Sequence, residues 1–258
     1  LAILSRLAEL APFARNPRGA LRFVEEWKAA LEPAAQGPAL RREAELRSAA
    51  GEYALALEAV AQARELVDAS SDAEERARIE ATASEASYNL GRHADARACC
   101  ERGLELLGDG SSSRVRIELL NQLGKIALAE GAPRRAVHFF EETKAAAESR
   151  VLVSEEARAL VNLGLVQARL GERDEAKATL QLGIGKAREA NDLVRIAFGR
   201  LNLGTLLHQA GDLGGAIAAY RECRALFRRL GNRTQLARAL NNLGNLHYLC
   251  GDYPRARG

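Results

Sequence analysis

The sequence predicts an all-α fold, a solenoid built from antiparallel helix hairpins. Six glycines recur at intervals of forty residues, and each is followed five residues later by an alanine. A fixed period of this length is typical of repeat architectures. Alanine, leucine, arginine and glutamate dominate the composition, and these residues lose little on entering a helix. No segment shows the alternation of apolar and polar residues that a strand would need.

The recurring glycines are expected to mark the turn of each hairpin. They open short sequences such as GERDEA at residues 171–176, where one helix must end and the next begin. Glycine adopts the left-handed conformation at a helix C-terminus without steric cost. The glycines are Gly51, Gly91, Gly131, Gly171, Gly211 and Gly251, and the alanines are Ala56, Ala96, Ala136, Ala176, Ala216 and Ala256.

A second small residue precedes each turn glycine by seven positions. It is Ala44 and Ser84 in the first two repeats, and Gly124, Gly164, Gly204 and Gly244 in the others. We expect it to face the recurring alanine across the hairpin, where a larger side chain would over-pack the contact. Residues 68–72, 109–113, 153–154 and 231–232 offer N-caps for the helices that begin each repeat.

The repeats predict two regions. Residues 38–258 hold six forty-residue repeats, of which the last is truncated early in its second helix. Residues 1–37 are predicted to form a degenerate N-terminal helical pair that caps the array, with helices over residues 1–10 and 18–31. Because the chain does not begin with Met, we expect a fragment of a longer protein.

The spacing resembles that of the tetratricopeptide repeat. The matching residues are Leu123-Gly124 with Ala136 and Phe140, Leu163-Gly164 with Ala176 and Leu180, and Leu203-Gly204 with Ala216 and Tyr220. Long repeats such as residues 239–256 look like the kinesin-light-chain branch of the family and like arrays in bacterial signalling proteins. The resemblance implies a right-handed superhelix whose first helices line a concave, peptide-binding groove.

The family likeness places the residue before each Leu-Gly pair inside that groove. It is Gln122, Asn162, Asn202 and Asn242. Asparagine is a mediocre residue in mid-helix, so its recurrence needs a cause. An amide carries a donor and an acceptor, so it could hold an extended peptide backbone. Alternatively, these amides bond between neighbouring first helices and stiffen the stack.

The candidate groove residues are basic and amide-rich at the ends and more apolar in the middle. They are Asn121, Gln122, Lys125, Arg158, Val161, Asn162, Leu165, Phe198, Asn202, Thr205, His208, Arg238, Asn241, Asn242 and Asn245. This pattern suits a protein or peptide segment with acidic flanks and an apolar anchor. In the alternative interpretation Val161, Leu165 and Leu201 belong to the core.

Composition and motifs argue against several other classes. The net charge is +3, and no run of Lys or Arg exceeds a pair, which disfavours nucleic-acid binding. No stretch approaches the roughly 18 apolar residues of a membrane span. Cys99, Cys100, Cys223 and Cys250 fit no zinc or disulfide pattern, and a cytoplasmic location is expected. The histidines form no metal-binding motif, although His208 and His247 could approach each other. We expect no catalytic, cofactor-binding or metal-binding residue.

The sequence therefore predicts a non-catalytic scaffold for protein–protein interaction. Two alternatives remain. One is a regulatory or sensor domain that binds a small effector within a larger signalling or transcription-regulating protein. The other is an architectural array that associates end to end.

Overall fold

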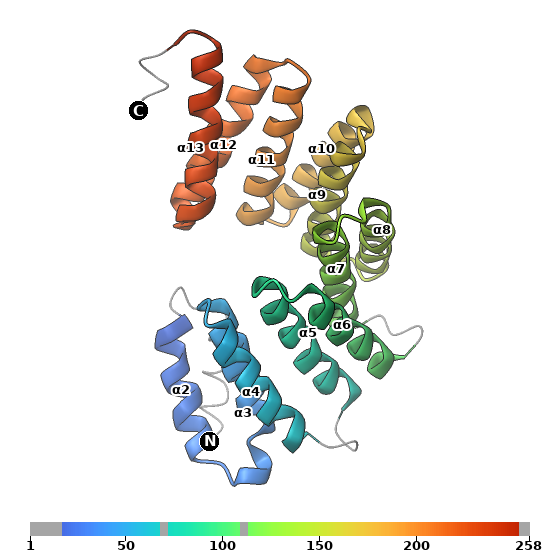
Figure 1. Ribbon diagram of the computed structural model, residues 1–258, viewed down its shortest axis with the longest axis vertical. Coiled ribbons are helices and arrows are strands. Elements are labelled where there is room, and N and C mark those ends of the chain that lie inside the picture. Colours follow the sequence, from blue (N-terminus) through green and yellow to red (C-terminus); the bar gives the residue numbers. More distant parts are fainter. Residues whose placement is uncertain (1–16, 68–71, 109–112, 253–258) are drawn as a thin grey trace. The chain divides into compact units, whose positions relative to one another are not determined.

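A computed structural model describes residues 17–67, 72–108 and 113–252 of the chain (Figure 1). Those residues form twelve α-helices and one short 3-10 helix, and they contain no strand. The chain divides into two compact units, residues 1–130 and residues 131–258. The predicted all-α architecture of helix hairpins is confirmed in each of them.

The first unit contains two complete hairpins and two further helices. Helices α3 with α4 and α5 with α6 pack as the hairpins, α2 packs on α3, and α7 packs on α5 and α6. The bounds are α2 Pro17–Ala29, η2 Pro33–Ala35, α3 Gly37–Ala49, α4 Tyr53–Leu66, α5 Ala73–Asn89, α6 His93–Leu107 and α7 Arg114–Ala129. Helix α2 corresponds to the helix predicted over residues 18–31, whereas the helix predicted over residues 1–10 lies outside the described residues.

The second unit repeats the same arrangement. Helices α9 with α10 and α11 with α12 form hairpins, and each second helix packs on the first helix that follows it. The first helices α9 and α11 also contact each other directly. The bounds are α8 Pro133–Ser149, α9 Val153–Leu170, α10 Arg173–Glu189, α11 Leu193–Gln209, α12 Leu213–Leu230 and α13 Arg233–Leu249.

The turn glycines have the conformation that the sequence predicts. All six have positive φ, between 75° and 86°. At Gly171, for example, φ is 86°, and the N–H of Glu172 donates to the carbonyl of Gln167 at 3.0 Å. This bond satisfies a carbonyl at the end of α9 that has no partner within the helix.

Small residues line the contact inside each hairpin, as predicted. The five recurring alanines that the structure describes are all 0% exposed, while Ala256 lies outside the described residues. A Cβ at Gly164 would lie 2.7 Å from Leu180 Cγ and 3.2 Å from the carbonyl oxygen of Ala176. In the α5–α6 hairpin the equivalent Ser84 hydroxyl bonds to the Cys100 thiol at 2.9 Å. The period therefore reflects close helix packing.

Three of the four predicted capping segments supply an N-cap. The side chains of Asp72, Ser113 and Asn232 accept hydrogen bonds from backbone N–H groups in the first turns of α5, α7 and α13. The prediction for residues 153–154 was wrong. The Ser154 hydroxyl lies inside α9 and donates to Asp192 Oδ2 at 2.6 Å. Asp192 in turn caps α11, so this serine links two first helices.

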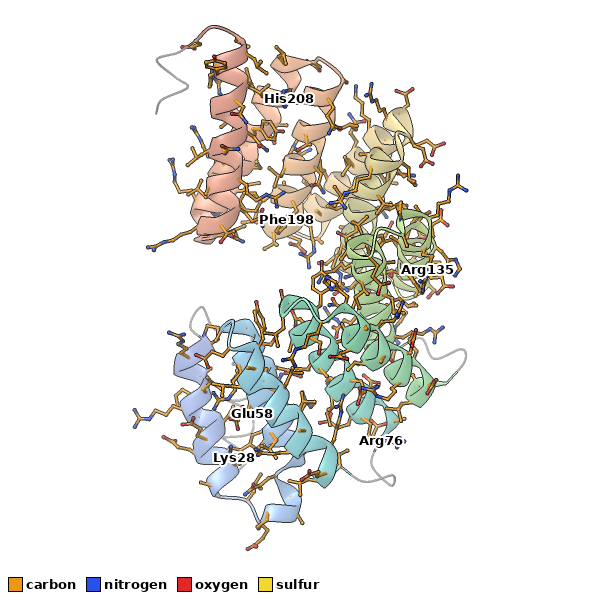
Figure 2. All side chains as sticks on the ribbon, in the orientation of Figure 1. Lys28, Glu58, Arg76, Arg135, Phe198 and His208 are labelled. Atoms are coloured by element: carbon orange, nitrogen blue, oxygen red, sulfur yellow. The ribbon has the colours of Figure 1, made fainter. Side chains whose placement is uncertain are left out.

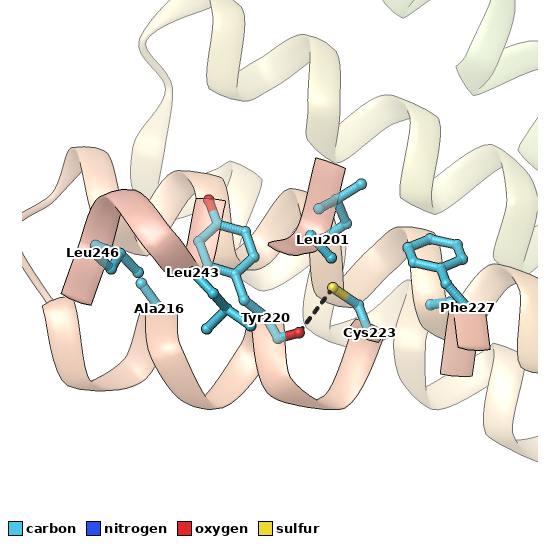
Figure 3. Packing of buried hydrophobic residues seen from close by; sticks show 9 residues of the cluster. Leu201, Ala216, Tyr220, Cys223, Phe227, Leu243 and Leu246 are labelled. Atoms are coloured by element: carbon cyan, nitrogen blue, oxygen red, sulfur yellow. Dashed lines mark hydrogen bonds between the residues drawn. The ribbon is translucent and has the colours of Figure 1, made fainter. Parts of the chain in front are cut away.

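An apolar cluster holds α11, α12 and α13 together (Figure 3). Tyr220 and Phe227 from α12 are its largest buried side chains, and Leu243 and Leu246 from α13 pack against them. The Cys223 thiol lies in the same cluster and donates to the Tyr220 carbonyl at 3.3 Å. Burial of these side chains fixes the orientation of the first helices, and therefore which of their residues face outward.

Candidate functional site

One face of the first helices in the second unit carries most of the candidate residues. We define the first-helix face as Arg158, Asn162 and Leu165 on α9, Phe198, Asn202 and Thr205 on α11, and Arg238, Asn242 and Asn245 on α13. Spacings of three and four residues place each trio on one side of its helix. All nine side chains are half-buried or exposed. Figure 2 shows the side chains of the described residues, with Phe198 and His208 labelled on α11.

Val161 does not belong to this surface. Its side chain is only 2% exposed, and a Cβ at Gly183 would lie 3.2 Å from Val161 Cγ2. Leu201, forty residues later, is also 2% exposed and joins the apolar cluster. The side chains at this position of the repeat pack between helices instead of facing outward. Val161 is therefore removed from the candidate groove. Asn241 shares the register but is exposed, because no described helix packs on that side of α13.

The candidates on α7 belong to the first unit and are mostly buried. Asn121 and Gln122 are 6% and 8% exposed, so little of either side chain is available to a ligand. The Lys125 ammonium donates to Gln122 Oε1 at 2.9 Å and lies 4.7 Å from the centre of the Tyr88 ring. Gln122 Nε2 is buried without a hydrogen-bond partner. Lys125 is therefore the most accessible candidate of this unit.

Asn242 takes part in a polar network that connects three helices. The Tyr220 hydroxyl on α12 donates to Thr205 Oγ1 on α11 at 3.1 Å. Burial raises the pKa of Tyr220, while its hydrogen bonds with Thr205 and Asn242 partly oppose that rise. Because Asn242 lies on α13, this amide contributes to the contact between hairpins. The partner lies on a second helix, whereas the stiffening interpretation expects bonds between neighbouring first helices.

Asn202 differs from Asn242. It is half-buried on α11, and its side-chain amide makes no hydrogen bond within the part of the chain that the structure describes. Asn162, its counterpart on α9, is also half-buried but already has an interaction partner. Asn202 is therefore the recurring amide with the greatest capacity to bind a ligand backbone.

The apolar part of the first-helix face is smaller than the sequence suggests. Phe198 is half-buried, and its ring lies edge-on to Phe227, with 5.3 Å between ring centroids and an interplanar angle of 76°. Leu165 is half-buried on α9. These two side chains are what remains of the predicted apolar centre. His208, one turn beyond Thr205, is half-buried at the end of α11.

Two charged residues of this region were missed in the sequence. Glu155 and Arg195 occupy the same place, forty residues apart, on the adjacent first helices α9 and α11. Glu155 Oε2 lies 2.6 Å from Arg158 Nη2. Burial lowers the pKa of Arg195, and the nearby Arg158 charge lowers it further. The sequence did contain a signal for them, because an acidic residue in one repeat is replaced by a basic residue at the same position of the next repeat. Adjacent first helices bring equivalent positions of consecutive repeats close together.

The cysteines and histidines provide no metal-binding arrangement. Cys99, Cys100 and Cys223 are buried thiols, Cys250 is exposed, and burial raises the pKa of Cys100 and Cys223 to about 12. His247 is buried and pairs with Asp252, with 3.7 Å between Nδ1 and Oδ2. Within residues 17–67, 72–108 and 113–252 no three His, Cys, Asp or Glu side chains lie together as metal ligands would. No helix in those ranges is long and apolar enough to cross a membrane.

Family models identify the repeat. Two models of the tetratricopeptide repeat match the sequence, one at residues 157–185 and the other at residues 195–258. The matched segments contain the hairpins and first helices that carry the first-helix face.

The chain carries tetratricopeptide repeats.

A curated relative and two solved structures agree with this assignment. Tetratricopeptide repeat protein 29 of Trypanosoma brucei brucei is 28% identical over 152 residues, which are 58% of this chain and 32% of that protein. The chain therefore spans about a third of the relative's length. The solved structures share the fold of packed helix hairpins at low sequence identity.

One of these structures is a signal transduction ATPase with a tetratricopeptide repeat sensor from Pyrococcus horikoshii. Its TM-score is 0.73 at 14% identity, over 98% of this chain and 40% of that one. The other is a Rap protein complexed with competence and sporulation factor. Its TM-score is 0.69 at 15% identity, over 92% of this chain and 76% of that one. At these sequence identities the similarity shows a shared fold and nothing more.

Proposed function

We propose that the protein is a non-catalytic scaffold that binds an extended protein or peptide segment along the first-helix face. The observation that carries this proposal is Asn202, a half-buried amide on that face with no hydrogen-bond partner among the described residues. An amide of this kind can pair with a ligand backbone whatever the ligand's side chains are. Asn162 and Asn242 occupy the same position on the flanking first helices.

The surroundings of Asn202 suit a segment with acidic flanks and an apolar residue. Arg158 and Arg238 lie on the neighbouring helices, and Leu165 and the outer edge of Phe198 supply apolar surface. Arg238 is exposed, and a solvent-facing arginine acts more on association rate and salt dependence than on affinity. Among proteins with this fold, the Rap protein was crystallised with competence and sporulation factor, which supports a binding role for such repeats.

A selection from a random peptide library tests the proposal without a known partner. Peptides enriched on the wild-type chain are measured against the triple variant Asn162→Ala, Asn202→Ala and Asn242→Ala. Three lost hydrogen bonds at about 0.5–1.5 kcal/mol each predict affinities lower by roughly one to three powers of ten. The matched control changes exposed second-helix residues, Gln181→Ala and Arg221→Ala, and should retain full affinity.

Two outcomes would contradict the proposal. Peptides that bind the triple variant and the wild type equally well would move the binding surface to the second helices or the turns. Failure to enrich any peptide, together with saturable binding of a small molecule, would favour the sensor alternative. The Pyrococcus horikoshii protein, whose repeats are described as a sensor, gives that alternative a precedent in the same fold.

A further inference from the structure

Helix α12 of the second unit exposes positive charge that nothing in its surroundings neutralises. Four arginines and one glutamate are its charged residues. Glu222 Oε2 lies 2.7 Å from Arg200 Nε on α11, so the acid of this helix is already paired. We define the basic surface as Arg221, Arg224 and Arg228, which spacings of three and four residues place on one side of α12. Arg221 and Arg228 are exposed, Arg224 is half-buried, and none of the three forms an ion pair among the described residues.

This excess of one charge is not a general property of the second helices. The preceding second helix, α10, exposes residues of both signs along its length. They are Arg173, Asp174, Glu175, Lys177, Arg188 and Glu189. Helix α12 therefore differs from α10 in carrying exposed arginines without neighbouring acids.

The second helices of the first unit expose the opposite charge. Helices α4 and α6 both pack on α5. We define the acidic surface as Glu58 and Glu65 on α4 with Glu101 and Glu105 on α6, and Figure 2 labels Glu58. All four side chains are exposed, and none has an ion-pair partner in the part of the chain that the structure describes. Spacings of seven and four residues place each pair on one side of its helix.

The arginines of α4 and α6 do not neutralise these acids, because they are paired elsewhere. Arg64 donates through Nε and Nη2 to the two oxygens of Glu80 on α5, at 2.8 Å and 2.7 Å. Arg102 Nη2 lies 3.0 Å from the same carboxylate. Arg97 Nη1 lies 3.3 Å from Glu130 Oε2 at the end of α7. The positive charges of α4 and α6 are thus directed to other helices, and the negative charges are left at the surface.

We propose that the basic surface of one copy of this chain docks on the acidic surface of a second copy. Charge complementarity identifies the occupant, because the chain itself presents both surfaces and the described residues leave both without ion-pair partners. A guanidinium group and a carboxylate can form two parallel hydrogen bonds. Neither surface includes a residue of the first-helix face, so the inference is independent of the proposed function.

The contact is expected to be weak and sensitive to salt, since single exposed ion pairs contribute little. Exposed charges interact over roughly 30 Å at about 10 mM NaCl but over only about 3 Å at about 1 M. Because the two surfaces differ, a docked pair still has one acidic and one basic surface unoccupied. Larger species should therefore form as the protein concentration rises.

Sedimentation velocity of the 258-residue chain measures this association. At about 10 mM NaCl the sedimentation coefficient should rise as the protein concentration is raised from about 5 µM to about 500 µM, and at about 1 M NaCl it should stay constant.

Two charge-reversal variants locate the contact. Arg221→Glu with Arg228→Glu removes the basic surface, and Glu65→Lys with Glu105→Lys removes the acidic surface. Each variant alone should lose the concentration dependence. An equimolar mixture of the two should regain it, because each variant keeps the surface that the other lacks. The milder pair Arg221→Gln with Arg228→Gln removes charge without reversing it and should also lose most of the association.

A third variant controls for net charge. Arg173→Glu with Lys177→Glu reverses two exposed charges on α10 and changes the net charge as much as the reversal on α12 does. It should associate as the wild type does. Circular dichroism checks that every variant keeps its helices.

The inference is overturned if the sedimentation coefficient of the wild type does not change with concentration at about 10 mM NaCl. Association that persists at about 1 M NaCl, or in either reversal variant alone, would also overturn it, since another contact would then hold the copies together. A mixture of the two reversal variants that stays monomeric, or a control variant that loses association equally, would show that the two surfaces do not meet.

Discussion

Gly204 on α11 lies directly against the Tyr220 ring on α12, so closely that a Cβ at Gly204 would be 2.7 Å from Tyr220 Cε1. The ring is 1% exposed, and its hydroxyl is bonded to Thr205, so it cannot move aside freely. This contact is the physical basis of the second glycine in the forty-residue period. Glycine is required here by close helix approach, although it is a poor residue inside a helix.

Gly204→Ala is therefore expected to destabilise the protein. Over-packing costs about 1–3 kcal/mol, which exceeds the roughly 0.5–1 kcal/mol that alanine gains in helix propensity. Gly185→Ala on α10 is the matched control, because a Cβ there would meet no atom within 4 Å. It should raise the free energy of unfolding. Denaturant unfolding of both variants measures the difference, and an equal change in both would contradict the packing explanation.

The turns between hairpins contain a second backbone constraint. Val151, Asn191 and Gly231 lie forty residues apart, and all have positive φ, at 56°, 53° and 70°. A β-branched residue is strained in that conformation, whereas asparagine and glycine tolerate it. Val151 is 81% exposed, so its side chain gains little from packing.

Val151→Asn should raise the free energy of unfolding by about 1 kcal/mol, because it removes that strain. The reciprocal change, Asn191→Val, should lower the free energy of unfolding by a similar amount. Thermal or denaturant unfolding of the two variants tests the prediction. A fall in the stability of Val151→Asn would show that contacts of the valine side chain, and not backbone strain, determine how residue 151 affects stability.

The paired and unpaired arginines should respond oppositely to substitution. Arg195→Met removes a poorly compensated charge and an unsatisfied buried donor, so stability should rise by up to about 1–2 kcal/mol. Arg41→Met removes the partner of Glu75 and leaves Glu45 with Arg42 alone, so stability should fall by a few kcal/mol at most. Melting temperatures of the two variants provide the comparison. A destabilised Arg195→Met chain would indicate a structural role for that arginine.

Glu43 gives the first unit a defined sensitivity to acid. It is 6% exposed, and its carboxylate lies 2.5 Å from Lys28 Nζ and 2.7 Å from Arg47 Nη2. Burial raises the pKa of Glu43, but the hydrogen bonds from Lys28 and Arg47 outweigh that effect and lower it overall. A carboxyl group with a lowered folded-state pKa contributes stability above its unfolded-state pKa. That contribution is lost as the pH falls through the folded-state pKa.

Wild type should therefore be more stable than Glu43→Gln at pH 7, and the difference should shrink as the pH falls below the usual pKa of about 4.3. Urea unfolding of both chains between pH 7 and pH 3 measures this. A difference that does not depend on pH would show that the amide substitution acts through packing alone.

The sequence predicts the hairpins well because their determinants are local. A left-handed residue at Gly171 and a small one at Gly164 follow from sterics that a short segment contains. The site is less predictable, because its residues meet across helices. Val161 is buried by the residues around Gly183 and Gly199, and Asn242 bonds to a tyrosine of the preceding helix. The Arg158–Arg195 pair appears only when α9 and α11 are set side by side.

The two interpretations of the asparagines make separate predictions for single variants. Asn242→Ala removes an interaction with Tyr220, so it should lower the melting temperature. Asn202→Ala removes no interaction within the described residues, and alanine is the better helix former, so its melting temperature should hold or rise. Circular dichroism melting of the two variants separates scaffolding from binding.

The affinity of one selected peptide for Asn202→Ala, measured beside Gln181→Ala by fluorescence anisotropy, tests the central claim most directly. A lost hydrogen bond worth about 0.5–1.5 kcal/mol predicts a two- to tenfold weaker complex for Asn202→Ala, with no change for Gln181→Ala on the second helix. Equal affinity of the Asn202→Ala variant and the wild type would contradict the account.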